Sequence, residues 1–219
     1  MSSRYAEIYQ GWKDAPHAFW EKAASEIDWY KTGDKVFDES AGQYGRWFPD
    51  WECNTCYNCL DRHVERGRRG QPALIYDSPI TGSAKTYTYE ELLDKVQAMA
   101  AVLSDQGIQK GDRVIIYMPM VPETAVALLA CARIGAVHSV VFGGFAPHEL
   151  ATRINDAQPK AIVAASCGLE PGRVIEYVPL VNEAIEQSDH KPESMIILPR
   201  EQVTDFPMTE GRDILWDDA

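Results

Sequence analysis

The chain has 219 residues, of which 45% are hydrophobic and 25% are charged. This composition excludes disorder for most of its length, because a chain of this size can bury roughly 70% of its unfolded surface. The longest apolar run, 125–132, is far shorter than the ~20 residues that cross a bilayer, so we expect no membrane association. The net charge of −12 argues against a nucleic-acid partner, because such proteins usually carry a basic face.

The first 70 residues predict an N-terminal arm rich in aromatic side chains. A helix is expected over 16–27, because Pro16 suits the first turn of a helix. Residues 32–51 predict irregular chain with several aromatic side chains. Such an arm is costly to leave exposed, so we expect residues 1–70 to pack on the main body. The start of the chain is polar, without an apolar signal stretch, and we therefore expect a cytoplasmic protein.

Residues 71–219 predict strands and helices in alternation. Thr88 and Glu91 form the pattern of a capping box, which indicates a helix that begins there and ends at Gly107. Strands separated by helices of this length are typical of parallel sheets. The predicted fold is therefore α/β, a mostly parallel sheet with helices on both faces. The remaining expected strands are 73–76, 85–88, 113–118, 136–142, 160–166 and 195–198, and the remaining expected helices are 122–133, 147–155 and 175–187.

Cys53, Cys56 and Cys59 are spaced three residues apart, which suggests either a metal site or a buried helical stripe. A zinc or iron–sulfur site needs a fourth ligand, and the nearby candidate is His63. Small cysteines also fill a buried stripe well, and we favour this second interpretation, with no metal. His138, inside an expected strand, predicts a hydrogen-bonded core residue.

Ligands of open parallel sheets bind at the carboxyl ends of strands, near the point where the strand order reverses. Three such ends are candidates here, those after Met118, Phe142 and Ser166, and each carries a turn or a glycine. Gly143 and Gly144 carry no side chains and could let a ligand approach the backbone, although their spacing alone favours a plain turn. Residues 167–173 could present Gly172 and Arg173 to a phosphate near the start of the helix expected at 175. A loop in solvent, without a ligand, is an equally good interpretation.

Motifs of common catalytic sites are absent from the sequence. No G-x-G-x-x-G string follows a strand, and there is no G-x-x-x-x-G-K-[ST], G-x-S-x-G or H-E-x-x-H string. No pair of carboxylates stands out as an acid and base. We therefore name no catalytic residue, and the residues alone predict a nucleotide-binding type of fold with binding loops.

Three longer strings are more specific than general α/β sequence. They are N-x-x-Y-N-x-L-D-R-H over 54–63, K-G-D-R-V-x-I-Y-M-P-M-x-P-E over 110–123, and A-C-A-R-I-G-A-V-H-S-V-V-F-G-G-F over 130–145. Together they closely resemble the N-terminal part of short-chain acyl-CoA synthetases, the acetyl- and propionyl-CoA synthetases of the adenylate-forming superfamily. The resemblance runs from Phe19 to Asp213, almost the whole chain.

This resemblance implies a ligase that joins ATP to a short-chain carboxylate and passes the acyl group from AMP to CoA, with ATP, Mg²⁺ and CoA as cofactors. Family members are much longer, and their T-S-G-[ST]-T-G-x-P-K-G phosphate loop and catalytic lysine lie downstream. No such loop occurs here. We therefore expect an N-terminal fragment that is inactive alone and continues downstream. Its uncovered apolar surface would then favour self-association.

The resemblance also implies a part of the CoA site. The family glycine at the position of Gly144 lets CoA pass close to the backbone, and the loop of Glu170, Pro171, Gly172 and Arg173 meets the nucleotide end of CoA. Acetyl-CoA synthetases place an arginine where Glu170 stands, so this form resembles the propionyl branch and favours propionate. The alternatives are a free-standing module that binds a nucleotide or CoA, and a thiol-based metal protein.

Overall fold

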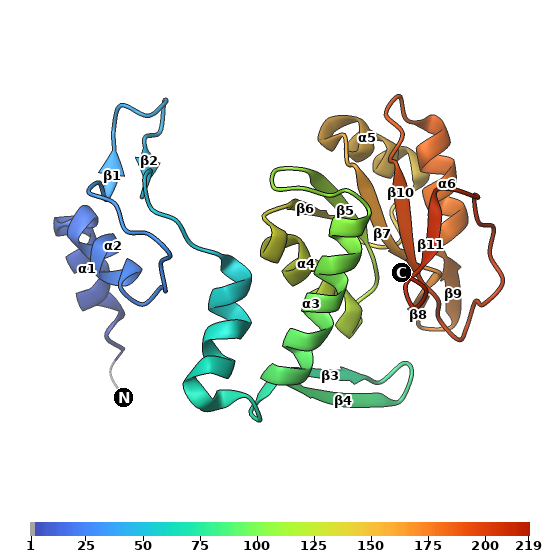
Figure 1. The fold of residues 1–219 in the computed structure, drawn as a ribbon, viewed down its shortest axis with the longest axis horizontal. Coiled ribbons are helices and arrows are strands. Elements are labelled where there is room, and N and C mark those ends of the chain that lie inside the picture. The colour runs from blue at the N-terminus through green and yellow to red at the C-terminus, as the bar shows by residue number, and fades with distance from the viewer. Residues whose placement is uncertain (1–2) are drawn as a thin grey trace. The chain divides into compact units, whose positions relative to one another are not determined.

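The computed structural model describes residues 3–219 and divides the chain into two compact units (Figure 1). One unit ends at Arg62 and the other runs from His63 to Ala219. The predicted boundary after residue 70 lies a short way beyond this division. Within residues 3–219, no helix is both long enough and apolar enough to cross a bilayer.

The N-terminal unit is built from helices α1 (Tyr5–Asp14) and α2 (Pro16–Ala24) and a short antiparallel pair, β1 (Phe37–Asp38) and β2 (Arg46–Trp47). Pro16 opens α2 as predicted, but the helix ends at Ala24 and not at Ile27. The aromatic side chains pack on one another: the rings of Phe37 and Trp47 lie 4.6 Å apart, centre to centre. The packing of this arm on the main body stays a prediction.

The cysteine run lies in and before a π-helix, η1 (Tyr57–Asp61), which η2 (Val64–Arg68) follows. Cys56 is buried, but Cys53 and Cys59 are exposed, so the predicted buried stripe of three cysteines is wrong. In a π-helix the backbone bonds run from i to i+5, and residues four apart, such as Cys56 and Leu60, share the buried face. Among residues 3–219 no three His, Cys, Asp or Glu side chains gather as a metal site would require.

The second unit contains a five-stranded parallel sheet, which confirms the predicted α/β class. Its strand order is β11-β10-β7-β5-β6. The predicted strands are present, while β11, in the acidic segment near the C-terminus, was not expected from the sequence. The bounds are β5 (Arg113–Tyr117), β6 (Val137–Val140), β7 (Ala161–Ala165), β10 (Ser194–Leu198) and β11 (Asp213–Leu215).

Four helices accompany this sheet: α3 (Tyr89–Asp105), α4 (Pro122–Ile134), α5 (Pro147–Ala157) and α6 (Tyr177–Gln187). Helix α3 packs on α4, and α5 packs on α6 (Figure 1). Side chains from one face of β5 and β7, such as Ile115 and Ile162, form a buried core with α5 and α6. Their sequence neighbours on the opposite face are buried as well, because α4 packs against β5 and β6.

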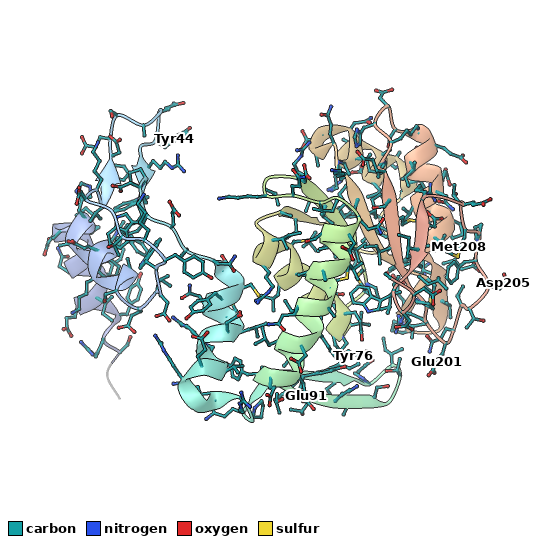
Figure 2. All side chains as sticks on the ribbon, viewed as in Figure 1. Tyr44, Tyr76, Glu91, Glu201, Asp205 and Met208 are labelled. Carbon is teal, nitrogen blue, oxygen red and sulfur yellow. The ribbon has the colours of Figure 1, made fainter. Side chains whose placement is uncertain are left out.

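Two antiparallel hairpins accompany the parallel sheet. Strands β3 (Pro72–Ser78) and β4 (Ser83–Thr88) precede α3, and β8 (Cys167–Glu170) and β9 (Arg173–Glu176) precede α6. The capping box at Thr88 is formed as predicted. A long loop joins β10 to β11, and Figure 2 labels Glu201, Asp205 and Met208 along it.

The edge strand β6 differs from the sequence prediction in its burial. His138 is exposed, so its predicted role as a core residue is wrong. Val137 and Val140 are each 55% exposed, because β6 pairs only with β5 among the described residues and leaves its other edge free. A β-branched sequence predicts a strand but not its place at the edge of the sheet.

Candidate CoA site

The strand order places a candidate site at the carboxyl ends of β5 and β7. From β5 the chain continues to β6 on one side, and it then returns to β7 on the other side of β5. This is the point at which the strand order reverses, where open parallel sheets bind their ligands. Tyr117, the last residue of β5, pairs in register with Ala164 of β7. The loops after β6 and β7 flank this point.

The loop after β6 contains Gly143 and Gly144. Gly144 is exposed and has φ +104°, a conformation that glycine adopts without strain. A Cβ built on Gly144 would meet only the Cδ1 atom of Ile175, at 3.9 Å. The backbone there is open to close approach, as predicted for a CoA contact. The contact itself stays a prediction.

The structure gives Gly143 a different role from Gly144. Gly143 is buried, and a Cβ there would lie 2.4 Å from the hydroxyl oxygen of Tyr177. Real side chains do not approach so closely, so the ring of Tyr177 occupies the space that a larger residue would need. The two neighbouring glycines are therefore required for separate reasons, one for packing and one for backbone conformation.

The loop after β7 is a hairpin and not the start of a helix. The sequence predicted a helix from 175, with Gly172 and Arg173 at its N-terminus, but α6 begins at Tyr177 and both residues belong to the β8–β9 hairpin. Pro171 followed by Gly172 at φ +78° is the pattern of a type II turn. Backbone N–H groups of a helix end are therefore not the phosphate donors here, and the guanidinium of Arg173 is the remaining candidate.

Glu170 and Arg173 form an ion pair across this turn. The Nη2 atom of Arg173 lies 2.8 Å from Oε2 of Glu170, and Nε donates to the same oxygen at 3.0 Å. The side chain of Arg173 is 66% exposed and therefore accessible to a phosphate. The carboxylate of Glu170 thus already occupies part of the guanidinium that the sequence predicts for a phosphate. Glu170, one of the predicted site residues, thus restrains the side chain of Arg173.

The two predicted loops lie together in the structure. Ile175, whose Cδ1 lies near Gly144, is two residues from Arg173 on β9, and residues two apart on a strand share a face. A ligand passing over the Gly144 backbone can therefore reach the face of the hairpin that carries Arg173. Gly144 thus lies near the face of the hairpin that carries Arg173, and a CoA site formed by Gly144 and the segment from Glu170 to Arg173 stays a prediction.

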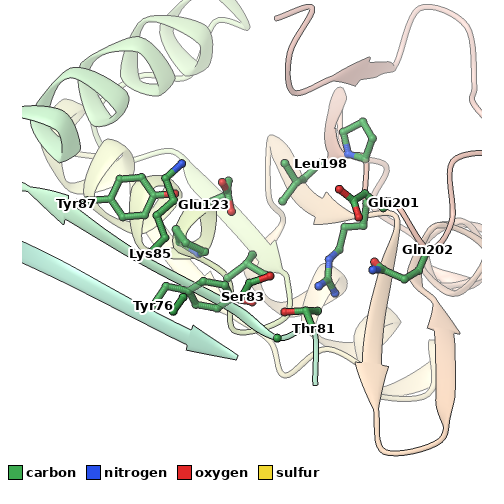
Figure 3. Close-up of a pocket in the computed structure, with 15 residues that line it drawn as sticks. Tyr76, Thr81, Ser83, Lys85, Tyr87, Glu123, Leu198, Glu201 and Gln202 are labelled. Atoms are coloured by element: carbon green, nitrogen blue, oxygen red, sulfur yellow. The ribbon is translucent and has the colours of Figure 1, made fainter. Parts of the chain in front are cut away.

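One surface hollow adjoins this hairpin, and a second hollow adjoins the first. One, of about 490 Å³, is lined by Leu169, Glu170, Gly172, Arg173 and Val174 together with Thr81 and Gln202 among others. The second, of about 700 Å³, shares Thr81 and Gln202 with the first and lies between the β3–β4 hairpin, the start of α4 and the segment after β10 (Figure 3).

Charged side chains of both signs line the larger hollow. Lys85 and Arg200 bring positive charge, and Glu123 and Glu201 bring negative charge. Two hydrogen bonds to the chain where β7 leads into β8 fix the position of Arg200. The Nη1 atom of its side chain donates to the carbonyl of Cys167 at 3.1 Å, and its backbone N–H donates to Oγ of Ser166 at 2.9 Å. Sequence reasoning missed Arg200. Its position just after an expected strand was the available signal.

The buried ionisable groups at the strand ends stay uncharged at neutral pH. Burial raises the pKa of Tyr117, and burial together with the neighbouring Tyr117 raises the pKa of Tyr177 to about 12. Burial also raises the pKa of the Cys167 thiol. These groups are suited to packing and hydrogen bonding and not to proton transfer, which fits a binding surface.

Comparisons with known proteins show the family to which the chain belongs. A model of the AMP-binding enzyme family matches residues 60–214, and a model described as the acetyl-coenzyme A synthetase N-terminus matches residues 5–59. Human acyl-CoA synthetase short-chain family member 3, mitochondrial, is 49% identical over 203 residues, 93% of this chain and 30% of that protein. Propionate–CoA ligase of Escherichia coli is 42% identical, over 96% of this chain and 33% of its own length.

A solved structure supports the fold. The acetoacetyl-CoA synthetase from Streptomyces lividans superimposes with a TM-score of 0.84 at 23% identity, covering 99% of this chain and 32% of that one. The chain thus spans about a third of the length of the relatives it matches. The resemblance predicted from the sequence strings is confirmed by these comparisons.

Proposed function

The chain belongs to the AMP-binding enzyme family, and on this premise we propose that the complete protein is a short-chain acid–CoA ligase. It would convert a short-chain carboxylate, ATP and CoA to acyl-CoA, AMP and diphosphate, with Mg²⁺ accompanying ATP. This chain contributes scaffold and part of the CoA site, and residues 71–219 are the first part of a larger α/β domain. The names of the relatives, an acyl-CoA synthetase and a propionate–CoA ligase, support the reaction class.

One observation carries the assignment of CoA to this surface. The exposed backbone of Gly144 lies beside the hairpin that holds Arg173, at the reversal point of the parallel sheet. Open backbone suits the narrow pantetheine arm of CoA, and an exposed guanidinium suits its phosphates. Gly144, Glu170, Pro171, Gly172 and Arg173 are the residues that we assign to this contact.

We assign propionate as the preferred acid and the cytoplasm as the compartment. The sequence E-P-G-R at 170–173 and the 42% identity to a propionate–CoA ligase support propionate. Comparing kcat/KM for acetate, propionate and butyrate tests the first assignment. Cell fractionation tests the second.

Pyrophosphate release by the complete protein with ATP, Mg²⁺, propionate and CoA tests the function itself. We expect turnover with all four components and acyl-CoA as the product. The 219-residue chain is the matched control, and we expect it to make no acyl-CoA. A complete protein that releases no pyrophosphate with any short-chain acid contradicts the proposal.

We also propose that the isolated chain self-associates through β6. Val137, Val140 and Phe142 are exposed there, the last at 70%, beside unpaired backbone groups of the strand edge. Exposed apolar edge strands pair readily with other chains. Sedimentation of the isolated chain should show dimers or larger species, and Val140→Lys should return it to a monomer.

A further inference from the structure

Tyr117 connects the end of β5 to the backbone of the glycine loop. Its side chain is fully buried, and its ring lies 5.0 Å from that of Tyr177, edge to face. Its hydroxyl accepts a hydrogen bond from the N–H of Gly144 at 2.9 Å and donates one to the carbonyl of Phe145 at 3.1 Å. One buried hydroxyl therefore holds two peptide groups of the loop, one on each side of the peptide that joins Gly144 and Phe145.

Tyr177 connects the same loop to the hairpin. Its hydroxyl lies where a Cβ would stand on either of two glycines, 2.4 Å from that position on Gly143 and 2.0 Å from it on Gly168 of β8. The N–H of Tyr177 donates to the carbonyl of Ser166 at 2.9 Å, which anchors the residue where the chain leaves β7. The ring is thus enclosed between the loop and the hairpin.

We propose that Tyr117 and Tyr177 are positioning residues for CoA, which hold the Gly144 loop and the Arg173 hairpin at a set separation. The proposal rests on the proposed function, because it names the residues that preorganise the same site. A loop held by two hydrogen bonds keeps the Gly144 backbone in its open conformation before the ligand arrives. Preorganisation of this kind raises affinity by avoiding the cost of ordering the loop on binding.

Removing only the hydroxyl of Tyr117 distinguishes a positioning role from a role in filling the core. A phenylalanine would fill almost the same volume and keep the contact with Tyr177, but it would leave the Gly144 N–H and the Phe145 carbonyl without this partner. Tyr117→Phe therefore tests the loop restraint with little change in packing. Ile154→Val, in the fully buried part of α5, is the matched control for a small loss of core stability.

Hydrogen exchange in the complete protein measures the restraint directly. In Tyr117→Phe we expect the backbone N–H of Gly144 to exchange at least tenfold faster, because its acceptor is removed. The N–H groups of β7 should be unchanged, and Ile154→Val should leave the Gly144 rate as in the wild type. An unchanged Gly144 rate in Tyr117→Phe overturns the proposal, whatever the activity of the protein.

Steady-state kinetics test the consequence for CoA. We expect Tyr117→Phe to raise the KM for CoA about five- to tenfold, while acid-dependent exchange of pyrophosphate into ATP, measured without CoA, changes less than about twofold. If the rate of pyrophosphate exchange and the rate of acyl transfer to CoA fall equally, the role of Tyr117 is a general structural one, and the proposal is overturned. An unchanged KM in Tyr117→Phe, with a raised KM in Arg173→Ala, overturns the positioning role and leaves the proposed function intact. A complete protein that forms no acyl-CoA overturns both.

Discussion

The carboxylate of Glu170 lies 2.8 Å from the guanidinium of Arg173, across the turn that joins β8 and β9. A phosphate that binds Arg173 must therefore compete with an anion already in place. We expect Glu170→Gln to lower the KM for CoA in the complete protein by about two- to fivefold, because an exposed ion pair is worth up to about 1 kcal/mol. A raised KM would instead show that Glu170 holds Arg173 in its productive orientation. The free energy of unfolding should fall by no more than this exposed pair contributes, about 1 kcal/mol.

Arg173→Ala should raise the KM for CoA about ten- to a hundredfold, because hydrogen bonds to charged groups contribute about 1.5–3 kcal/mol. Adenylate formation, measured without CoA, should remain nearly intact. Arg68→Ala removes the same charge from an exposed position on η2 and is the matched control. A CoA dependence equal to that of the wild type would remove Arg173 from the site.

The neighbouring glycines should respond differently to alanine. Gly143→Ala places a Cβ against Tyr177, and we expect it to lower the free energy of unfolding by about 1–3 kcal/mol, as overpacking does. Gly144→Ala meets open space and should cost about 1 kcal/mol through its positive φ. Gly144→Ala should nevertheless raise the KM for CoA, because the added methyl group lies where CoA would approach the backbone. Gly143→Ala, which costs more stability, should raise this KM less. Urea unfolding and CoA kinetics of both variants check this, and an equal response of the two glycines would contradict it.

The capping box of α3 should contribute a pH-dependent part of stability. The carboxylate of Glu91 accepts from the N–H of Thr88 at 2.8 Å and from its hydroxyl at 3.0 Å, and these bonds lower the pKa of Glu91 in the folded protein. Because the folded pKa lies below the unfolded one, the contribution is full above about pH 4.5 and is lost as pH falls through the folded pKa. Urea unfolding between pH 3 and 7 should show a shallower acid loss in Glu91→Gln, and identical slopes would contradict the argument.

Local signals in the sequence were sufficient for most of the fold. The capping box at Thr88, the proline at the start of α4 and the glycine after it each act through backbone geometry within a few residues. β-Branched runs such as 113–117 predict strands for the same reason. These elements are found where they were expected, and the long strings within them were enough to identify the family.

The sequence was less informative where burial or pairing depends on distant chain. The sequence predicts a helix from Ile175, but pairing with β8 makes Ile175 and Glu176 part of a strand, and the helix begins at Tyr177. His138 looks like a core residue, but its strand lies at the edge of the sheet. Cys53 and Cys59 have helical spacing, but Cys53 lies before the helix and Cys59, inside the π-helix, is exposed.

By itself, the sequence determined the α/β class and the family, because both are encoded in characteristic strings and local backbone preferences. The glycine and arginine that we propose for CoA follow from the resemblance to that family. Only the tertiary structure decided how these residues work together. The Tyr117 hydroxyl meets Gly144, 27 residues away along the chain, and Tyr177 fills the space beside Gly143 and Gly168. Such relationships arise from strand order and packing, which bring together residues that no sequence spacing connects.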